Sequence, residues 1–137
     1  MPSQIVRTAA MSLFGCAFIA GCTSGQRVEA DGLIVLIAEP ANSGDAALLS
    51  GKLTDVGGCV GIENYAVVWP HGTRVSGEGA LSLTVPGQPK VALGDQVHVG
   101  GGVLFEAEER RAVYSIAGVS IPASCVSAGV WMSSPSD

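Results

Sequence analysis

Four cysteines are the residues of this chain with the most distinctive chemistry. They are Cys16, Cys22, Cys59 and Cys125. A thiolate is a nucleophile and a metal ligand, and two thiols can form a disulfide. Zinc sites bring Cys and His ligands together at short, regular spacings. These cysteines and the two histidines, His71 and His98, show no such spacing, so the sequence predicts no metal site and no cofactor.

The first two cysteines lie in and after an apolar segment near the N-terminus. This segment, Ala9–Ala20 (AAMSLFGCAFIA), follows one basic residue, Arg7. Its length of about a dozen residues is typical of the core of an export signal, whereas a membrane-spanning helix needs about 20 apolar residues. The small residues Ala20 and Gly21 then precede Cys22. The pattern predicts a signal peptide over residues 1–21 that is cleaved before Cys22.

Ile19-Ala20-Gly21-Cys22 resembles the lipobox of bacterial lipoproteins, in which an aliphatic and two small residues precede an invariant cysteine. The resemblance covers only the first 22 residues. It implies that the Cys22 thiol receives a diacylglyceryl group, which would anchor the exported protein to the outer face of the cytoplasmic membrane or to the outer membrane. Leu13-Phe14-Gly15-Cys16 is a poorer match because Phe14 is bulky. The alternative is an ordinary cysteine at position 22 after normal signal cleavage.

Cys59 and Cys125 remain in the mature chain once Cys16 is removed and Cys22 is lipidated. Exported proteins meet oxidising conditions, and two leftover cysteines then form one disulfide. The sequence predicts this bond between Cys59 and Cys125. The alternative is a pair of buried free thiols.

The charge of the mature chain bears on its partners. All 12 acidic residues and 6 of the 7 basic residues follow residue 21, so the formal net charge is 6 − 12 = −6. Nucleic-acid-binding domains carry a basic surface, so we expect no nucleic-acid partner. We expect contact with the membrane through the lipid and with a protein of the cell envelope.

The histidines and glycines match no catalytic or phosphate-binding motif. His71 lies in a Trp69-Pro70-His71-Gly72 turn, and a catalytic base there would need a nucleophile and an orienting carboxylate. No nucleophile elbow supplies them, so the sequence predicts a protein that is not an enzyme, with a hydrolase using His71 as a remote alternative. His98 is expected to be a half-buried or outward-pointing residue of a strand. Gly100-Gly101-Gly102 lacks the Lys and the helix of a phosphate-binding loop.

Two further sets of side chains are candidates for a ligand pocket and for a cation site. Trp69, held extended by the following proline, could line a small apolar pocket together with His71. Three acidic residues, Glu106, Glu108 and Glu109, have two arginines beside them and no calcium-binding spacing, which indicates a solvated hairpin tip.

The elements that position these residues are predicted to be strands. Glycine is 19 of 137 residues, well above the usual fraction of about 7%, and it disfavours helices. The run Leu33–Ala38 suits a strand buried on both faces. Leu49–Glu63 is predicted to be a hairpin that turns at Gly57-Gly58, with Leu53 facing Ile62, Lys52 facing Glu63, and Cys59 near the rim. The other strands are predicted at Tyr65–Pro70, Leu81–Val85, Val91–Val99 with a corner at Gly94-Asp95, Val103–Phe105, Val113–Ile116 and Cys125–Met132.

These seven to eight short strands indicate an all-β fold. A small closed or partly open barrel similar to an OB-fold is expected, with a sandwich as the alternative. The domain is predicted over residues 33–132, after a lipidated cysteine and flexible tether at residues 22–32 and before a disordered tail at residues 133–137.

A looser resemblance covers about residues 50–132. Gly58-Cys59, Val67-Val68-Trp69-Pro70 with Gly72-Thr73, Val97 and Gly100-Gly101-Gly102 are similar to small uncharacterised lipoproteins of high-GC bacteria. That resemblance implies no activity. The sequence thus predicts a membrane-anchored, non-enzymatic binding or structural module, and a small-ligand carrier with an apolar pocket inside the barrel is the alternative.

Overall fold

The computed structural model describes residues 25–107, 114–126 and 128–135. These residues fold mainly into strands, which confirms the predicted all-β class. In chain order the elements are β1 (Gln26–Ala30), β2 (Leu33–Ile37), β3 (Ala47–Val56), β4 (Cys59–Ile62), β5 (Tyr65–Trp69), β6 (Arg74–Ser76), β7 (Ser82–Thr84), β8 (Val91–Ala92), β9 (Gln96–Phe105), β10 (Tyr114–Ile116), β11 (Val119–Ile121), α1 (Ala123–Val126) and β12 (Val130–Ser133).

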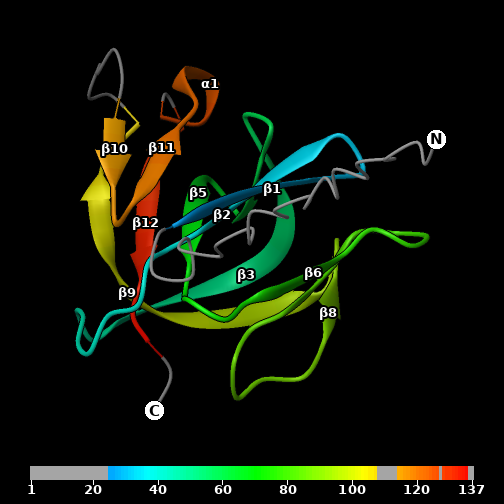
Figure 1. Cartoon of the computed structure of the whole chain (residues 1–137), viewed down its shortest axis with the longest axis horizontal. Coiled ribbons are helices and arrows are strands. Elements are labelled where there is room, and N and C mark those ends of the chain that lie inside the picture. The colour runs from blue at the N-terminus through cyan, green and yellow to red at the C-terminus, as the bar shows by residue number, and fades with distance from the viewer. Residues whose placement is uncertain (1–24, 108–113, 127, 136–137) are drawn as a thin grey trace, which may run out of the picture.

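The largest sheet has seven strands in the order β1-β2-β4-β3-β9-β12-β5. Strand β5 also pairs with β2, at Leu36↔Val68 and Ile37↔Trp69, so the sheet curls into a ring-like arrangement (Figure 1). β2 runs parallel to β4 and β5, and β12 runs parallel to β5. Two smaller sheets, β6-β7-β8 and β10-β11, flank the ring.

Strand β2 lies at the centre because its side chains are apolar on both faces. Leu33, Val35 and Ile37 belong to one buried cluster, while Leu36 and Ala38 belong to a second. The prediction of a strand buried on both faces is confirmed. Because a strand alternates its side chains between faces, a continuous apolar run is the pattern that two cores require.

Two hydrophobic cores fill the fold. The first draws at least one residue from each of β2, β3, β4, β5, β9 and β12, and β7 adds Leu83 to it. The second lies on the other face of β2, β4, β5 and β12, where β11 and α1 cover it with Val119, Ile121 and Val126.

The hairpin β3–β4 has the predicted register. Leu53 pairs with Ile62, and the turn glycines Gly57 and Gly58 have φ values of 62° and 94°, a left-handed conformation that glycine adopts without strain. Lys52 and Glu63 face each other as predicted. The contact is made to the backbone, because the Lys52 N–H donates to Glu63 Oε1 at 3.0 Å.

Strand β1 corrects the predicted tether. Residues Gln26–Ala30 pair antiparallel with β2 through a tight turn at Asp31-Gly32, where both φ values are positive. The flexible-tether prediction for residues 22–32 is therefore wrong from Gln26 onward. Val28 and Ala30 pack against the first core, and this apolar contact holds the strand on the sheet.

The C-terminal region also differs from its prediction. The strand expected over Cys125–Met132 is instead the short helix α1 followed by β12. Ser133 is the last residue of β12, and the Ser134 N–H donates to the Gly100 carbonyl at 3.0 Å. The prediction of a disordered tail is wrong for these two serines, because the sheet hydrogen bonding continues past Met132.

Strands β8 and β9 bear out the corner predicted at Gly94-Asp95. β8 belongs to the small sheet with β7, whereas β9 pairs with β3 and β12 in the large one. Beyond the corner, β9 is one strand through Gly100-Gly101-Gly102 to Phe105. A Cβ at Gly101 would lie 2.0 Å from the Met132 carbonyl oxygen, so glycine permits the close approach of β9 and β12.

Candidate functional site

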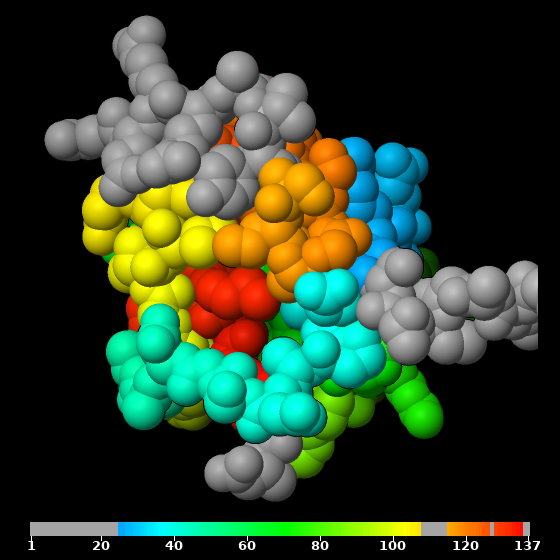
Figure 2. Space-filling model, turned by 60° about the vertical axis from the view of Figure 1, so that its left-hand side comes forward, coloured from blue at the N-terminus to red at the C-terminus, as the bar shows by residue number. Residues whose placement is uncertain are grey.

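A surface cleft of about 320 Å³ lies beside the end of β12. Its walls come from the loop after β2, the turn after β5, residues 132–135 at the end of β12, and Pro86. Figure 2 shows residues 130–135 in red, set back behind the loop 38–46 in cyan to teal. The lining residues are Ala38, Glu39, Pro40, Ala41, Ser43, Gly44, Asp45, Pro70, His71, Pro86, Met132, Ser133, Ser134 and Pro135.

Parallel pairing explains why these segments meet. Strands β2, β5 and β12 run in the same direction as neighbours, so their carboxyl ends lie at one edge of the sheet. Ala38 follows β2, Pro70 follows β5, and Ser133 ends β12. The cleft is thus built from the carboxyl ends of three parallel strands, although these segments lie far apart in the sequence.

Backbone hydrogen bonds fix the loop that forms one wall. The Ala38 N–H donates to the Trp69 carbonyl at 2.8 Å, and the Glu39 N–H donates to the Ala117 carbonyl at 2.8 Å. At the other end of the loop, the Ser134 hydroxyl donates to the Asp45 carbonyl. The wall is therefore tied to β5, to the β10–β11 hairpin and to the C-terminal segment.

The turn after β5 presents His71 to the cleft. Thr73 closes this turn, since its Oγ1–H donates to the Pro70 carbonyl at 2.7 Å and its N–H donates to the same oxygen at 3.2 Å. Gly72 has a φ of 87°, which allows the tight bend. His71 itself is exposed and lines the cleft.

Trp69, the other half of that pair, does not line the cleft. Its side chain is fully buried in the first core, and its Nε1–H donates to the Val60 carbonyl at 3.1 Å. The structure therefore separates Trp69 from His71. Trp69 is the last residue of β5, whereas His71 lies in the turn that follows Pro70. Trp69 is thus a packing residue of the first core, and it is absent from the lining of this cleft.

Ser133 is the feature of the cleft that sequence analysis missed. The residue is only 5% exposed, and within the described part of the chain its buried Oγ has no hydrogen-bond partner. A buried polar group without a partner costs about 1–3 kcal/mol. The hydroxyl oxygen is itself enclosed, so it is an unsatisfied buried group behind the wall of the cleft. No sequence signal marked it, since Ser133 stands at the start of a serine-rich end.

The charge of the cleft is acidic. Glu39 and Asp45 line it, and the described lining residues include neither lysine nor arginine. They include no aromatic ring either, so the described part of the wall has no stacking surface of the kind on which bases bind. The arrangement suits a ligand that donates hydrogen bonds and carries positive charge.

The residues that a hydrolase would need are near the cleft but are not connected. His71, Ser133 and Asp45 all contribute to the lining. Within the described residues, no hydrogen bond joins His71 to a serine or a carboxylate. A separate pair, Ser50 Oγ and His98 Nδ1, lies 2.7 Å apart. Both residues are exposed, on the neighbouring strands β3 and β9, and His98 points outward.

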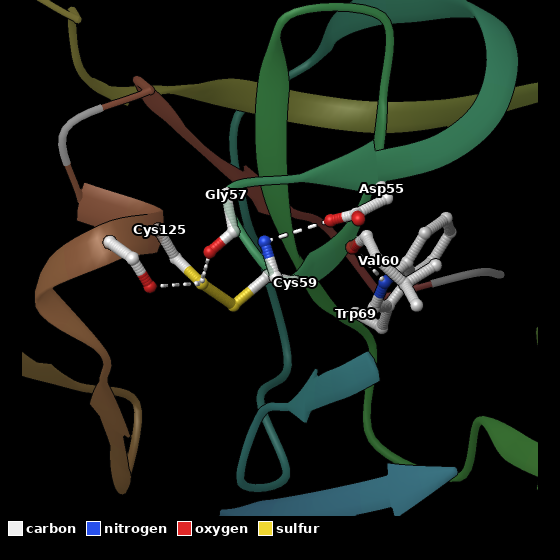
Figure 3. The surroundings of a disulfide bond; sticks show 8 residues. Asp55, Gly57, Cys59, Val60, Trp69 and Cys125 are labelled. Carbon is white, nitrogen blue, oxygen red and sulfur yellow. Dashed lines mark hydrogen bonds between the residues drawn. A yellow bond between two sulfur atoms is a disulfide. The ribbon is translucent and has the colours of Figure 1, made fainter. Parts of the chain in front are cut away.

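The disulfide between Cys59 and Cys125 is present, as predicted. It joins the β3–β4 turn to α1 (Figure 3). Asp55 stabilises the turn by accepting a hydrogen bond from the Gly58 N–H at 2.8 Å. The expectation that Cys59 lies near the rim is wrong: both cysteines are fully buried in the second core, because α1 and β11 cover that face of the hairpin.

Several of the sequence predictions concern residues outside the described ranges. The signal peptide, the lipobox and Cys22 lie outside the described residues, as do Glu108 and Glu109 of the charged tip. In the part of the chain that is described, no three His, Cys, Asp or Glu side chains gather where they could hold a metal ion. The described helix is far too short to cross a membrane.

Comparison with protein-family models, with curated proteins and with solved structures finds no match for this chain.

Proposed function

We propose that this protein is a lipid-anchored binding module of the bacterial cell envelope. Cys22 carries the lipid, and the cleft at the carboxyl ends of β2, β5 and β12 binds a small polar ligand. The observation that carries the binding role is the cleft itself, about 320 Å³ in volume, which the acidic residues Glu39 and Asp45 line. The proposal assigns the domain no catalytic step.

The anchor is supported by the order of residues from Arg7 to Cys22. A basic start, an apolar run, two small residues and a cysteine follow one another. Two acyl chains hold a protein on a membrane stably, whereas a single chain binds only marginally. We therefore expect the mature protein to remain bound to the membrane when the membrane is washed with salt.

The test is to express the full chain in a bacterium, separate the membranes, and measure the mass of the mature protein. The wild type should sediment with membranes, begin at Cys22, and carry the diacylglyceryl mass. Cys22→Ala should appear unmodified in the soluble fraction with an unchanged circular dichroism spectrum, because the described fold begins after that residue.

The matched control is Cys16→Ala, which removes the cysteine of the poorer lipobox match. This variant should keep both the lipid and the membrane location. A Cys22→Ala protein that remains membrane-bound with a lipid mass would refute the assignment of the anchor to Cys22.

A further inference from the structure

Strand β1 is an edge strand of the large sheet. Within the described part of the chain it pairs with β2 alone, so the other side of its backbone faces no strand of the described fold. An edge of this kind presents N–H and C=O groups to which another chain can add a strand. The residues Gln26–Ala30 are therefore a candidate surface for strand pairing.

The pairing with β2 fixes which residues of β1 direct their backbone groups outward. The Ile34 N–H of β2 donates to the Gly58 carbonyl at 2.9 Å, so the backbone of Ile34 is directed away from β1. Glu29 is the residue of β1 that lies opposite Ile34. Because antiparallel strands alternate hydrogen-bonded and non-hydrogen-bonded pairs, Glu29 and also Arg27, two residues earlier, direct their N–H and C=O groups to the free edge.

The side chains of these two residues are exposed and carry opposite charges. Val28 and Ala30 point to the other face of the strand and pack against the first core. An antiparallel second copy of β1 can form hydrogen bonds only where an outward-directed residue of one copy lies opposite one of the other. Registers that set Arg27 against Arg27, or Glu29 against Glu29, bring like charges together, which destabilises the pair. The register that sets Arg27 against Glu29 joins opposite charges.

We propose that β1 pairs antiparallel with β1 of a second copy of this protein in the same membrane. The two-fold axis passes between the two Val28 residues, so Arg27 of each copy lies opposite Glu29 of the other. Both copies then use the same surface, as two-fold symmetry requires. This inference rests on the proposed anchor, because five residues from each copy form a small interface and confinement to one membrane raises their effective concentration.

The test is oxidative crosslinking of the full-length processed lipoprotein in bacterial membranes, through a cysteine placed at the two-fold axis. In the proposed register the two residues at position 28 form a non-hydrogen-bonded pair, with Cα atoms about 4.5 Å apart, which a disulfide can bridge. Val28→Cys should therefore give a dimer on a non-reducing gel. Ala30→Cys, on the same face of β1, is the matched control. It should remain monomeric, because position 30 lies opposite position 26.

A second pair of sites makes the test independent of position 28. Gln26→Cys and Ala30→Cys should each remain monomeric when expressed alone. Coexpressed, they should crosslink to each other, because position 26 of one copy lies opposite position 30 of the other. The native cysteines of the described fold do not interfere, since Cys59 and Cys125 are bonded to each other.

Charge exchange tests the register. In the Val28→Cys background, Arg27→Glu alone or Glu29→Arg alone sets like charges opposite each other in both pairs. The crosslinked fraction should fall by at least about tenfold. The two substitutions together restore opposite charges and should restore the dimer, whereas a variant that had only misfolded would not be rescued. Crosslinking that is the same in all of these variants would overturn the inference.

Sedimentation of the same samples separates failure of the pairing from failure of the anchor. Membrane-bound protein that forms no dimer at either pair of sites overturns the pairing and leaves the anchor standing. Crosslinked protein in the soluble fraction overturns the anchor and leaves the strand pairing standing, and monomeric soluble protein overturns both. A Val28→Cys adduct with a different protein, or an Ala30→Cys dimer as abundant as the Val28→Cys dimer, would also overturn the inference.

Discussion

Loss of the Cys59–Cys125 disulfide should lower the free energy of unfolding by about 4 kcal/mol. The two cysteines are 66 residues apart in the sequence, so the bond closes a long loop in the unfolded chain. The chain-entropy model gives a loss of about 15 cal/mol/K for that length, or roughly 4 kcal/mol at 25 °C. Small domains are stable by only about 5–15 kcal/mol in total, so the effect should be large.

Thermal unfolding of oxidised and reduced protein measures this difference. Both cysteines are fully buried, so the bond must be reduced in the unfolded state, after which the chain is refolded with reductant present. For a domain of this size 1 kcal/mol moves Tm by about 4 °C. The reduced protein should therefore melt about 15 °C below the oxidised protein.

The reduced wild type keeps both sulfur atoms, so it isolates the loss of the crosslink from the loss of packing. A Cys59→Ala and Cys125→Ala double variant also loses buried volume and should melt at the same temperature or lower. Both proteins are compared in a Cys22→Ala background, so that Cys22 adds no thiol to the measured count. A Tm that does not change on reduction, or free thiols at both positions in the native protein, would refute this reasoning.

Two further predictions concern close backbone packing and pH. Gly101→Ala should destabilise the protein by more than about 2 kcal/mol, because its Cβ would overlap the Met132 carbonyl oxygen. Gly79→Ala, also at positive φ but with open space around it, should cost only about 1–2 kcal/mol for the strain; equal losses in urea unfolding would contradict the packing argument. The hydrogen bond to Glu106, then burial, then the charge of Glu106 raise the pKa of Tyr65 above its ordinary 10.0. The contribution of Tyr65 to stability should thus be complete below pH 10.0 and should disappear as the pH rises through the raised pKa. Glu106→Gln should lower the pKa of Tyr65, which an absorbance titration of tyrosinate measures by comparison with Tyr65→Phe. An unchanged titration in Glu106→Gln would contradict the role of Glu106.

The elements that follow from local patterns were predictable. The run Leu33–Ala38 specifies a strand buried on both faces, because neither face carries a polar residue. The β3–β4 register follows from the two turn glycines, since a two-residue turn fixes which residues face each other. The disulfide followed from counting cysteines, which needs no knowledge of the fold.

Strand β1 was missed because three of its five residues are exposed and polar. An edge strand needs few apolar residues, so its alternation is weak. Asp31-Gly32 was the signal that could have found it. An Asp-Gly pair before an apolar strand is a strong hairpin indicator, and Val28 and Ala30 supply the inward-facing side chains.

The burial of Cys59 and the location of the cleft depend on contacts between distant segments. Alternation along the hairpin places the Cys59 side chain on the face opposite Val60, but it does not reveal that α1 covers that face. Similarly, Ser133 reads as part of a polar tail until β12 is known to pair with β5 and β9. Two parallel strands cannot be connected by a tight turn, so they lie far apart in the sequence. No local sequence pattern therefore indicates which of them pair.

The same parallel pairings place the cleft at the end of the domain where β1 begins. Because β2, β5 and β12 share a direction, the residues that follow or end them meet at one edge of the sheet. Because β1 is antiparallel to β2, it must begin at that edge. The proposed lipid on Cys22 would therefore hold this end of the domain near the bilayer, because only residues 23–25 separate Cys22 from β1.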